Sequence, residues 1–253
     1  MSWRGAITFG LVNIPVTLHR AATDRSVRLR QIHLEDRSPI RHRRFCETEH
    51  REVSPDEIGR GFQAGPHLVE ITDDDLEHLP LPAARQLRIE QFAPIKQIPP
   101  MQIGRNYHVA AGSGAERAYV LLRDVLDETG RCALGRIALA QRERLALVRA
   151  EHPILIVSLL YWPDELNDPT PLAPPAEASP EQQERDMART LVESLSADFD
   201  PEGYADHYRE ALMQLAEAKL AGQRPEASPE AAPVLDLADA LTASLQNLEQ
   251  SGE

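Results

Sequence analysis

The residues of this chain whose type and spacing point to chemistry are arginines. Seven of them lie within one stretch of 26 residues, from Ser26 to Arg51. They are Arg28, Arg30, Arg37, Arg41, Arg43, Arg44 and Arg51. A guanidinium is a planar fork of donors that matches two phosphate oxygens, so a row of them can hold a nucleic-acid backbone. We therefore predict that DNA passes here, with a merely solvated charged surface as the alternative.

Strand periodicity indicates how these side chains are held. With a period of two, Arg28 and Arg30 share one side of a strand, and Arg41 and Arg43 share one side of the next. Residues 35–39 form a turn-like connection between the two strands. Because both faces carry charge, the pair cannot be buried. We predict a β-ribbon that projects from a core and carries these arginines together with Arg44.

Signals for catalysis or metal binding are weaker. The sequence contains no phosphate-cradling glycine loop and no recognisable nucleophile with its base. Cys46 and His50 have ligand-like spacing, but a structural zinc needs four ligands and no second pair lies nearby. Residues 73–75 are three aspartates that a metal-dependent nuclease could use, yet Thr72 before them is typical of a helix start. We therefore predict no catalytic residue, no metal and no cofactor.

The charge is divided sharply along the chain. The net charge is −13, but residues 1–165 hold 22 basic and 22 acidic residues, whereas residues 166–253 hold 5 and 18. The first 45 residues hold nine arginines and three acids, a balance of +6. DNA responds to the local field within about 8 to 10 Å, so the whole-chain charge does not exclude it. An acidic protein surface, the chain's own C-terminal third included, is the alternative partner for the arginines.

Composition sets further expectations. Two cysteines far apart in sequence fit a reducing compartment, and there is no apolar run of 18 residues and no basic-then-apolar leader. We expect a soluble cytoplasmic protein without a membrane partner.

Residues 1–165 have the pattern of an α+β domain that is mainly β. A long strand from Trp3 to His19 changes phase at Val12-Asn13, which predicts a bulge or bend. Later strands are expected at 67–71, 87–92, 102–110, 132–140 and 154–161. Residues 116–129 predict an amphipathic helix that ends at Gly130. Its apolar face comprises Ala118, Leu121, Leu122, Val125 and Leu126. A second basic group is Arg136, Arg142 and Arg144.

Residues 166–253 have a different organisation. After a proline-rich linker, a capping box at Ser179 begins a helix to about Leu195, and Asp200-Pro201 begins another to Gly222, so 179–222 is a helical arm. Residues 223–233 form a second linker. The segment 234–253 is predicted to be an acidic amphipathic helix and tail. Its apolar stripe, Leu237, Leu241, Leu245 and Leu248, either folds back on the body or docks on another protein.

Several motifs together resemble the prokaryotic Ku family of DNA-end-binding proteins. They are Trp3–Val16 (WRGAITFGLVNIPV), Arg41–Cys46 (RHRRFC) with Arg51–Val53, Ile71–Leu76 (ITDDDL), and Asp198–Pro201 (DFDP) with Tyr204 and His207–Arg209. The match runs in unbroken order over nearly the whole chain, and the first motif is long and unusual.

The resemblance implies a homodimer whose β-barrels and arching bridge segments form a ring around a double-stranded DNA end. It implies a helical arm that embraces the partner subunit, and recruitment of the ATP-dependent multi-domain DNA ligase of bacterial non-homologous end joining. The bridge would be residues 27–71, with Arg136, Arg142 and Arg144 on the barrel side of the channel. This chain departs from many members in lacking a lysine-rich C-terminal tail and extra cysteines near Cys46. We therefore expect its acidic end to contact protein rather than DNA.

Overall fold

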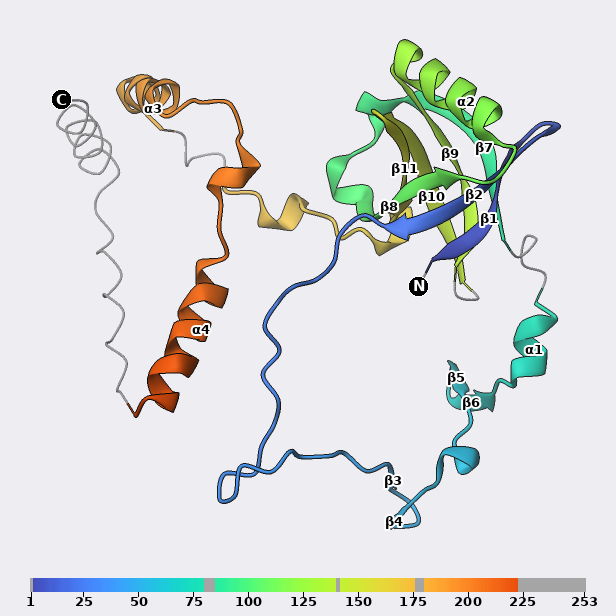
Figure 1. Ribbon diagram of the computed structural model, residues 1–253, viewed down its shortest axis with the longest axis vertical. Coiled ribbons are helices and arrows are strands. Elements are labelled where there is room, and N and C mark those ends of the chain that lie inside the picture. Colours follow the sequence, from blue (N-terminus) through green and yellow to red (C-terminus); the bar gives the residue numbers. More distant parts are fainter. Residues whose placement is uncertain (1, 80–84, 140–141, 176–179, 223–253) are drawn as a thin grey trace. The chain divides into compact units, whose positions relative to one another are not determined.

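The computed structural model describes residues 2–79, 85–139, 142–175 and 180–222 (Figure 1). The chain divides into two units, Met1–Asp168 and Pro169–Glu253. The first contains a closed β-barrel, and the described part of the second contains two α-helices. The predicted α+β class with more strand than helix is confirmed.

Seven strands form the barrel, in the order β1-β2-β8-β11-β10-β9-β7. They are β1 (Trp3–Phe9), β2 (Val12–Arg20), β7 (Gln86–Pro94), β8 (Ile103–Ala111), β9 (Arg131–Leu139), β10 (Arg142–Glu151) and β11 (Ile154–Leu160). Neighbours pair antiparallel except β1 and β7, which run parallel and close the barrel. A closed barrel leaves no long edge strand unpaired.

The first strand differs from its prediction. Instead of one bent strand, β1 and β2 form a hairpin in which Phe9 pairs with Val12, so that Gly10 and Leu11 form the turn. Gly10 has a φ of 54°, which glycine adopts without the steric cost that other residues carry. A tight turn shifts the alternation of inward side chains just as a bulge does. The sequence pattern therefore could not distinguish a hairpin from a bent strand.

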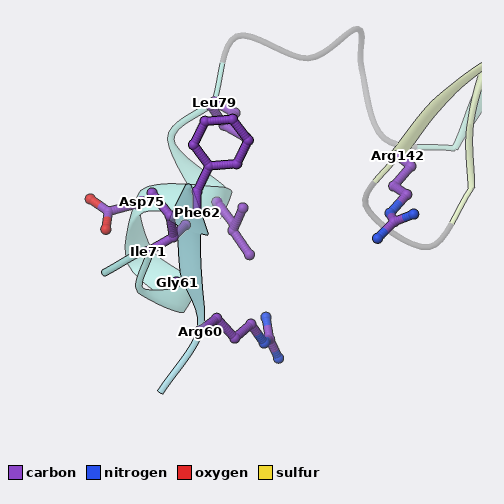
Figure 2. A pocket seen from close by; sticks show the side chains of 8 residues that line it. Arg60, Gly61, Phe62, Ile71, Asp75, Leu79 and Arg142 are labelled. Atoms are coloured by element: carbon purple, nitrogen blue, oxygen red, sulfur yellow. The ribbon is translucent and has the colours of Figure 1, made fainter. Parts of the chain in front are cut away.

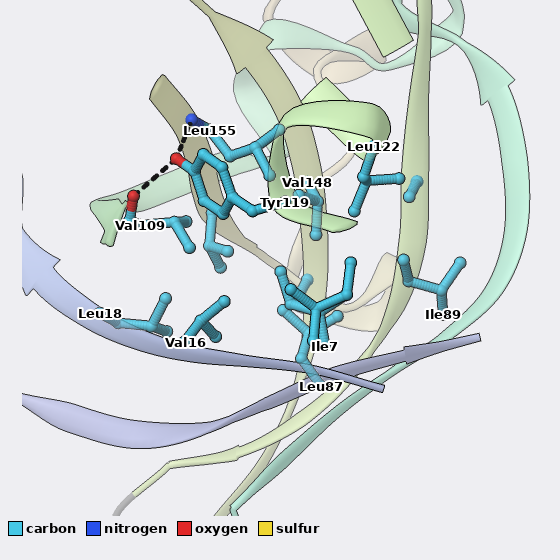
Figure 3. Packing of buried hydrophobic residues seen from close by; sticks show 14 of the residues in the cluster. Ile7, Val16, Leu18, Leu87, Ile89, Val109, Tyr119, Leu122, Val148 and Leu155 are labelled. Atoms are coloured by element: carbon cyan, nitrogen blue, oxygen red, sulfur yellow. Dashed lines mark hydrogen bonds between the residues drawn. The ribbon is translucent and has the colours of Figure 1, made fainter. Parts of the chain in front are cut away.

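Inward-facing aliphatic side chains from all seven strands fill the barrel, among them Ile7, Leu18, Leu87 and Val109. The helix α2 (Glu116–Thr129) covers one end of this core and ends at Gly130, as predicted (Figures 1 and 3). Its Tyr119 hydroxyl donates to the carbonyl oxygen of Val109 and accepts from the amide of Leu155, both at 2.7 Å. One buried side chain thus satisfies the backbone of two strands and fixes the helix on them.

The buried face of α2 is rotated from the predicted one. Tyr119, Leu122 and Leu126 are buried, whereas Leu121 is exposed and Val125 is half-exposed. The last two line an open apolar groove of about 360 Å³ together with Phe9 and Phe92, among others. The predicted stripe was correct for Leu122 and Leu126 and missed Tyr119, whose hydroxyl is satisfied by residues distant in sequence.

Residues 21–85 are inserted between β2 and β7 and are called the insertion below. The insertion contains the two-residue strands β3 (Phe45–Cys46) and β4 (Arg51–Glu52), the hairpin β5 (Gly61–Ala64) with β6 (His67–Glu70), and the short helix α1 (Asp73–Glu77). All eight residues of β5 and β6 are exposed. Thr72 caps α1 as predicted, and its hydroxyl accepts from the Asp75 amide at 3.1 Å. The partner of the predicted strand at 67–71 is β5, for which no strand was predicted.

The second unit contains α3 (Gln182–Ser194) and α4 (His207–Leu220), joined through a 3-10 turn at Pro201–Gly203. The helix α3 has Glu181 as its N-cap residue, and the predicted cap Ser179 lies outside the described residues. Asp206, not Asp200, caps α4. Asp200 caps the 3-10 turn instead, because the chain turns again before the helix begins. Neither helix has a buried residue. The predicted segments 223–233 and 234–253, with Leu237, Leu241, Leu245 and Leu248, lie outside the described residues.

Candidate nucleic-acid interface

Both ends of the insertion attach at the same end of the barrel. On one side, Arg20 at the end of β2 pairs with Tyr107, and the Ala21 amide donates to the carbonyl oxygen of Asn106 at 3.1 Å. On the other side, the carbonyl oxygen of Arg85 accepts from the Ala6 amide at 3.0 Å. This end, called the barrel mouth below, lies opposite the end that α2 covers, because β8 runs from Ile103 at the mouth to Ala111 beside α2.

The arginine stretch of the insertion contains a short hairpin. Ile32 and Pro39 form an isolated antiparallel bridge, flanked by hydrogen bonds from His33 N to Ser38 O (2.8 Å) and from Ile40 N to Gln31 O (3.0 Å). The predicted connection is therefore a turn between paired segments. The pairing stops there, so the segments that carry Arg28, Arg30, Arg41 and Arg43 have no regular secondary structure and are not strands. An isolated two-stranded ribbon that packs on no further sheet or helix is only marginally stable in water, which accounts for the short ladder.

The arginines of this stretch differ in how far their charge is compensated. Arg28 lies 3.4 Å from Asp24, and Arg43 lies 2.8 Å from Glu52. Within the described ranges, no carboxylate pairs with Arg30, Arg41 or Arg44, and all three side chains are exposed. Exposed ion pairs are weak and exchange easily for a phosphate. Three of the five insertion arginines in the predicted site are therefore free to bind phosphate, and Arg28 and Arg43 become so on exchange.

Arg51 is held differently from its neighbours. Its guanidinium pairs with Glu49 at 2.6 Å and with Glu57 at 2.7 Å. The Arg51 side chain and the hydrogen bonds from Ser54 lower the pKa of Glu57 to about 2. Arg51 therefore braces the turn at residues 55–57 and is a poor candidate for contact with phosphate.

Arg142 and Arg144 line the barrel mouth. They continue the inward-facing alternation of β10, whose next members Ala146 and Val148 belong to the core. A cavity of about 450 Å³ opens here, with Arg105 of β8 beside them. Arg144 lies 3.6 Å from Glu165, while Arg105 and Arg142 have no ion-pair partner among the described residues. Sequence reasoning missed Arg105, although the alternation of Arg105, Tyr107 and Val109 in β8 would have indicated it.

Arg136 lies on the other face of the sheet. It is on the outer side of β9, 3.3 Å from Glu90 and 3.5 Å from Glu143, with its guanidinium 6.0 Å from the centre of the Trp162 ring. The structure thus brings Arg142 and Arg144 together and sets Arg136 apart, compensated by two carboxylates. Grouping the three by nearness in sequence had ignored the alternation of faces along β9 and β10.

A second concavity, of about 620 Å³, involves the insertion and Arg142 (Figure 2). Its insertion side combines the apolar Phe62, Ile71 and Leu79 with Arg60, which pairs with Asp73 at 2.7 Å. The lining of this concavity therefore combines basic and apolar side chains.

Features of other kinds of site are weak in the described part of the chain. Residues 73–75 form the first turn of α1, and the Thr72 hydroxyl lowers the pKa of Asp75. No group of three or more histidine, cysteine, aspartate or glutamate side chains there is arranged to hold a metal ion. No described helix is long and apolar enough to cross a membrane.

Known proteins resemble this chain over most of its length. The family model described as the Ku70/Ku80 beta-barrel domain matches residues 8–187. A "Non-homologous end joining protein Ku" from Streptomyces avermitilis is 39% identical over 98% of this chain and 80% of that protein. The protein of the same name from Mycobacterium tuberculosis is 34% identical over 98% of this chain and 93% of its own length. The one from Frankia casuarinae is 39% identical, and the chain spans only 63% of it.

Proposed function

Because the chain belongs to the Ku family, we propose that it binds double-stranded DNA ends without regard to sequence and acts in non-homologous end joining. The observation that carries this proposal is the insertion of 65 residues, 21 to 85, rooted at both ends at the barrel mouth. Uncompensated arginines lie on both sides: Arg30, Arg41 and Arg44 on the insertion, and Arg105 and Arg142 at the mouth. A segment tied at both ends to a basic platform is suited to enclosing a rod of phosphates.

A homodimer completes the proposed ring. Support comes from apolar side chains that one copy leaves exposed, such as Phe62, Leu68 and Val69 of the β5–β6 hairpin. The helices α3 and α4 add to this support, because α3 has an amphipathic sequence and neither helix buries a residue. A two-stranded hairpin and a pair of helices without a core are marginal unless a partner covers them. The function is non-catalytic, since contacts to phosphate alone are sufficient to hold any end.

The topology of the DNA tests this proposal. At about 0.15 M salt, a short linear duplex should be retained in a gel shift, while the same sequence closed into a covalent circle should not bind, because a closed ring can be entered only from an end. A nicked circle serves as the control, since a nick relieves torsion without offering an end. Equal retention of linear and circular DNA would refute the ring and leave a general DNA-coating protein.

The same proposal includes recruitment of the ATP-dependent multi-domain DNA ligase through residues 234–253. The leucines at 237, 241, 245 and 248 repeat at helical spacing beside Asp236 and Asp239, a pattern typical of a helix that docks in a groove. Deleting 223–253 should leave end binding nearly intact and weaken stimulation of the ligase. A variant with alanine at the four leucines should reproduce the effect without shortening the chain. Full stimulation by both variants would exclude this docking role.

A further inference from the structure

We propose that the barrel mouth is a binding pocket for one unpaired nucleotide at a DNA end. This inference rests on the proposed function and adds a class of substrate to it, namely ends that carry an overhang. The pocket is the cavity of about 450 Å³ described above, within the range of about 300–1,000 Å³ typical of small-molecule sites. Its principal side chains are Arg105, Tyr107, Leu139, Arg142, Arg144 and Tyr161.

The mixed chemistry of this lining favours a nucleotide over a duplex backbone. The phosphates on the outside of a duplex need cationic groups on a surface, and the insertion already offers these. The mouth adds a recessed apolar floor, because Tyr107, Leu139 and Leu159 pack against the barrel core. A phosphate on the arginines and a base against this floor and Tyr161 would use both halves of the lining. Sites for single-stranded nucleic acid combine a basic groove with aromatic rings in this way.

Tyr161 is the side chain best suited to stack on a base. Its exposed fraction is 47%, so one part of the ring is accessible. Another part lies against β8, where a methyl group at Gly104 would be 3.6 Å from the ring. The Tyr161 backbone is also fixed, since its amide donates to the Gln102 carbonyl at 2.9 Å and its carbonyl accepts from Gln102 Nε2 at 3.1 Å. A ring held in place loses little entropy when a base stacks on it.

The arginines supply the complementary charge at the rim. Arg142 and Arg144 stand two residues apart on β10, and Arg105 extends from β8, so the guanidiniums converge on the cavity from two strands. Only Arg144 has a described carboxylate neighbour, Glu165 at 3.6 Å, and that contact is long for a charged pair. The pocket therefore carries uncompensated positive charge that can bind a phosphate. Stacking makes no distinction among bases, in keeping with a protein that accepts any end.

Three duplexes of equal double-stranded length test this inference: one blunt, one with four unpaired thymidines at the 3′ end, and one with the same at the 5′ end. Fluorescence anisotropy at about 0.15 M salt should show tighter binding of at least one overhang duplex than of the blunt one, by about fivefold, the low end of base–aromatic stacking. Tyr161→Ala should remove this gain and leave blunt-end affinity unchanged. Tyr161→Phe should retain it, because the ring remains.

A control variant and a cross-linking experiment test whether the overhang contacts Tyr161 itself. Phe92→Ala removes an aromatic ring of similar exposure beside α2, away from the mouth, and should leave the overhang gain intact. A 5-iodouracil in the overhang should cross-link on irradiation to the peptide that contains Tyr161. Equal affinity for all three duplexes, or an equal loss for blunt and overhang DNA in Tyr161→Ala, would overturn the inference while the proposed function stood. Failure to bind blunt duplex at all would overturn the proposed function itself.

Discussion

Replacing Arg41, Arg43 and Arg44 together with alanine should weaken binding to a linear duplex about a hundredfold at physiological salt. The estimate assigns about 0.5 kcal/mol to each of the six charge-assisted contacts that the proposed homodimer would lose, because the side chains are exposed. Each phosphate contact contributes about −0.9 to the slope of log affinity against log salt, so the slope should become shallower by about 2.7 per protomer. Filter binding across a salt series measures both quantities.

The matched control removes three cations of the same domain from other surfaces. Lys96, Arg117 and Arg131 are exposed and lie away from the arginine stretch of the insertion. Their triple alanine variant changes the net charge by the same amount, so any difference in DNA affinity between the two variants is due to where the charges lie. It should keep nearly the full affinity and slope. If the two triple variants lost affinity to the same extent, the insertion would be no more than part of a diffuse positive field.

Gly135→Ala should destabilise the barrel by about 3 kcal/mol or prevent it from folding. Gly135 of β9 pairs with Ile89 of β7 where the register between the two strands shifts, and a Cβ there would overlap the carbonyl oxygen of Arg88. The obstruction is backbone and not a side chain that can rotate, so the cost lies at the upper end of overpacking. Urea unfolding, followed by tryptophan fluorescence because Trp3 packs on the core, reports the loss.

Gly59→Ala is the companion variant. A methyl group at Gly59 meets only the Glu70 carboxyl group, at 3.3 Å, at the end of a flexible side chain. Its unfolding midpoint should stay close to that of the unaltered protein. A Gly135→Ala protein with an unchanged midpoint would mean that β7 and β9 do not approach each other at this bulge as described.

Local signals in the sequence predicted where helices and strands lie better than they predicted which side of each is buried. The bounds of α2 followed from its apolar period and Gly130, whereas the burial of Tyr119 depends on Val109 and Leu155, which lie on strands that only the closed barrel brings together. A hairpin at Gly10 and a bent strand shift the alternation of inward side chains in the same way. Only the pairing of the strands in the folded barrel shows that the hairpin is present.

In the candidate site too, some residues could be predicted from local sequence and others depend on contacts distant in the chain. The exposed arginines of the insertion could be recognised from sequence because nothing distant buries them. At the barrel, Arg142 and Arg144 were predicted, but the place of Arg136 depends on which face of β9 is inward, and Arg105 depends on the pairing of β8 with β11. Register between strands is set by contacts far apart in the chain, and one sequence carries little information about it.

The parallel contact between β1 and β7 has a consequence for how the molecule is assembled. The barrel closes only when strands on either side of the 65-residue insertion meet, so folding must first close a long loop. The entropy of closure grows only with the logarithm of loop length, about 0.6 kcal/mol for each doubling. The barrel therefore tolerates a longer or shorter insertion at little thermodynamic cost. The size of the opening through which DNA is proposed to pass can thus change independently of the platform that supports it.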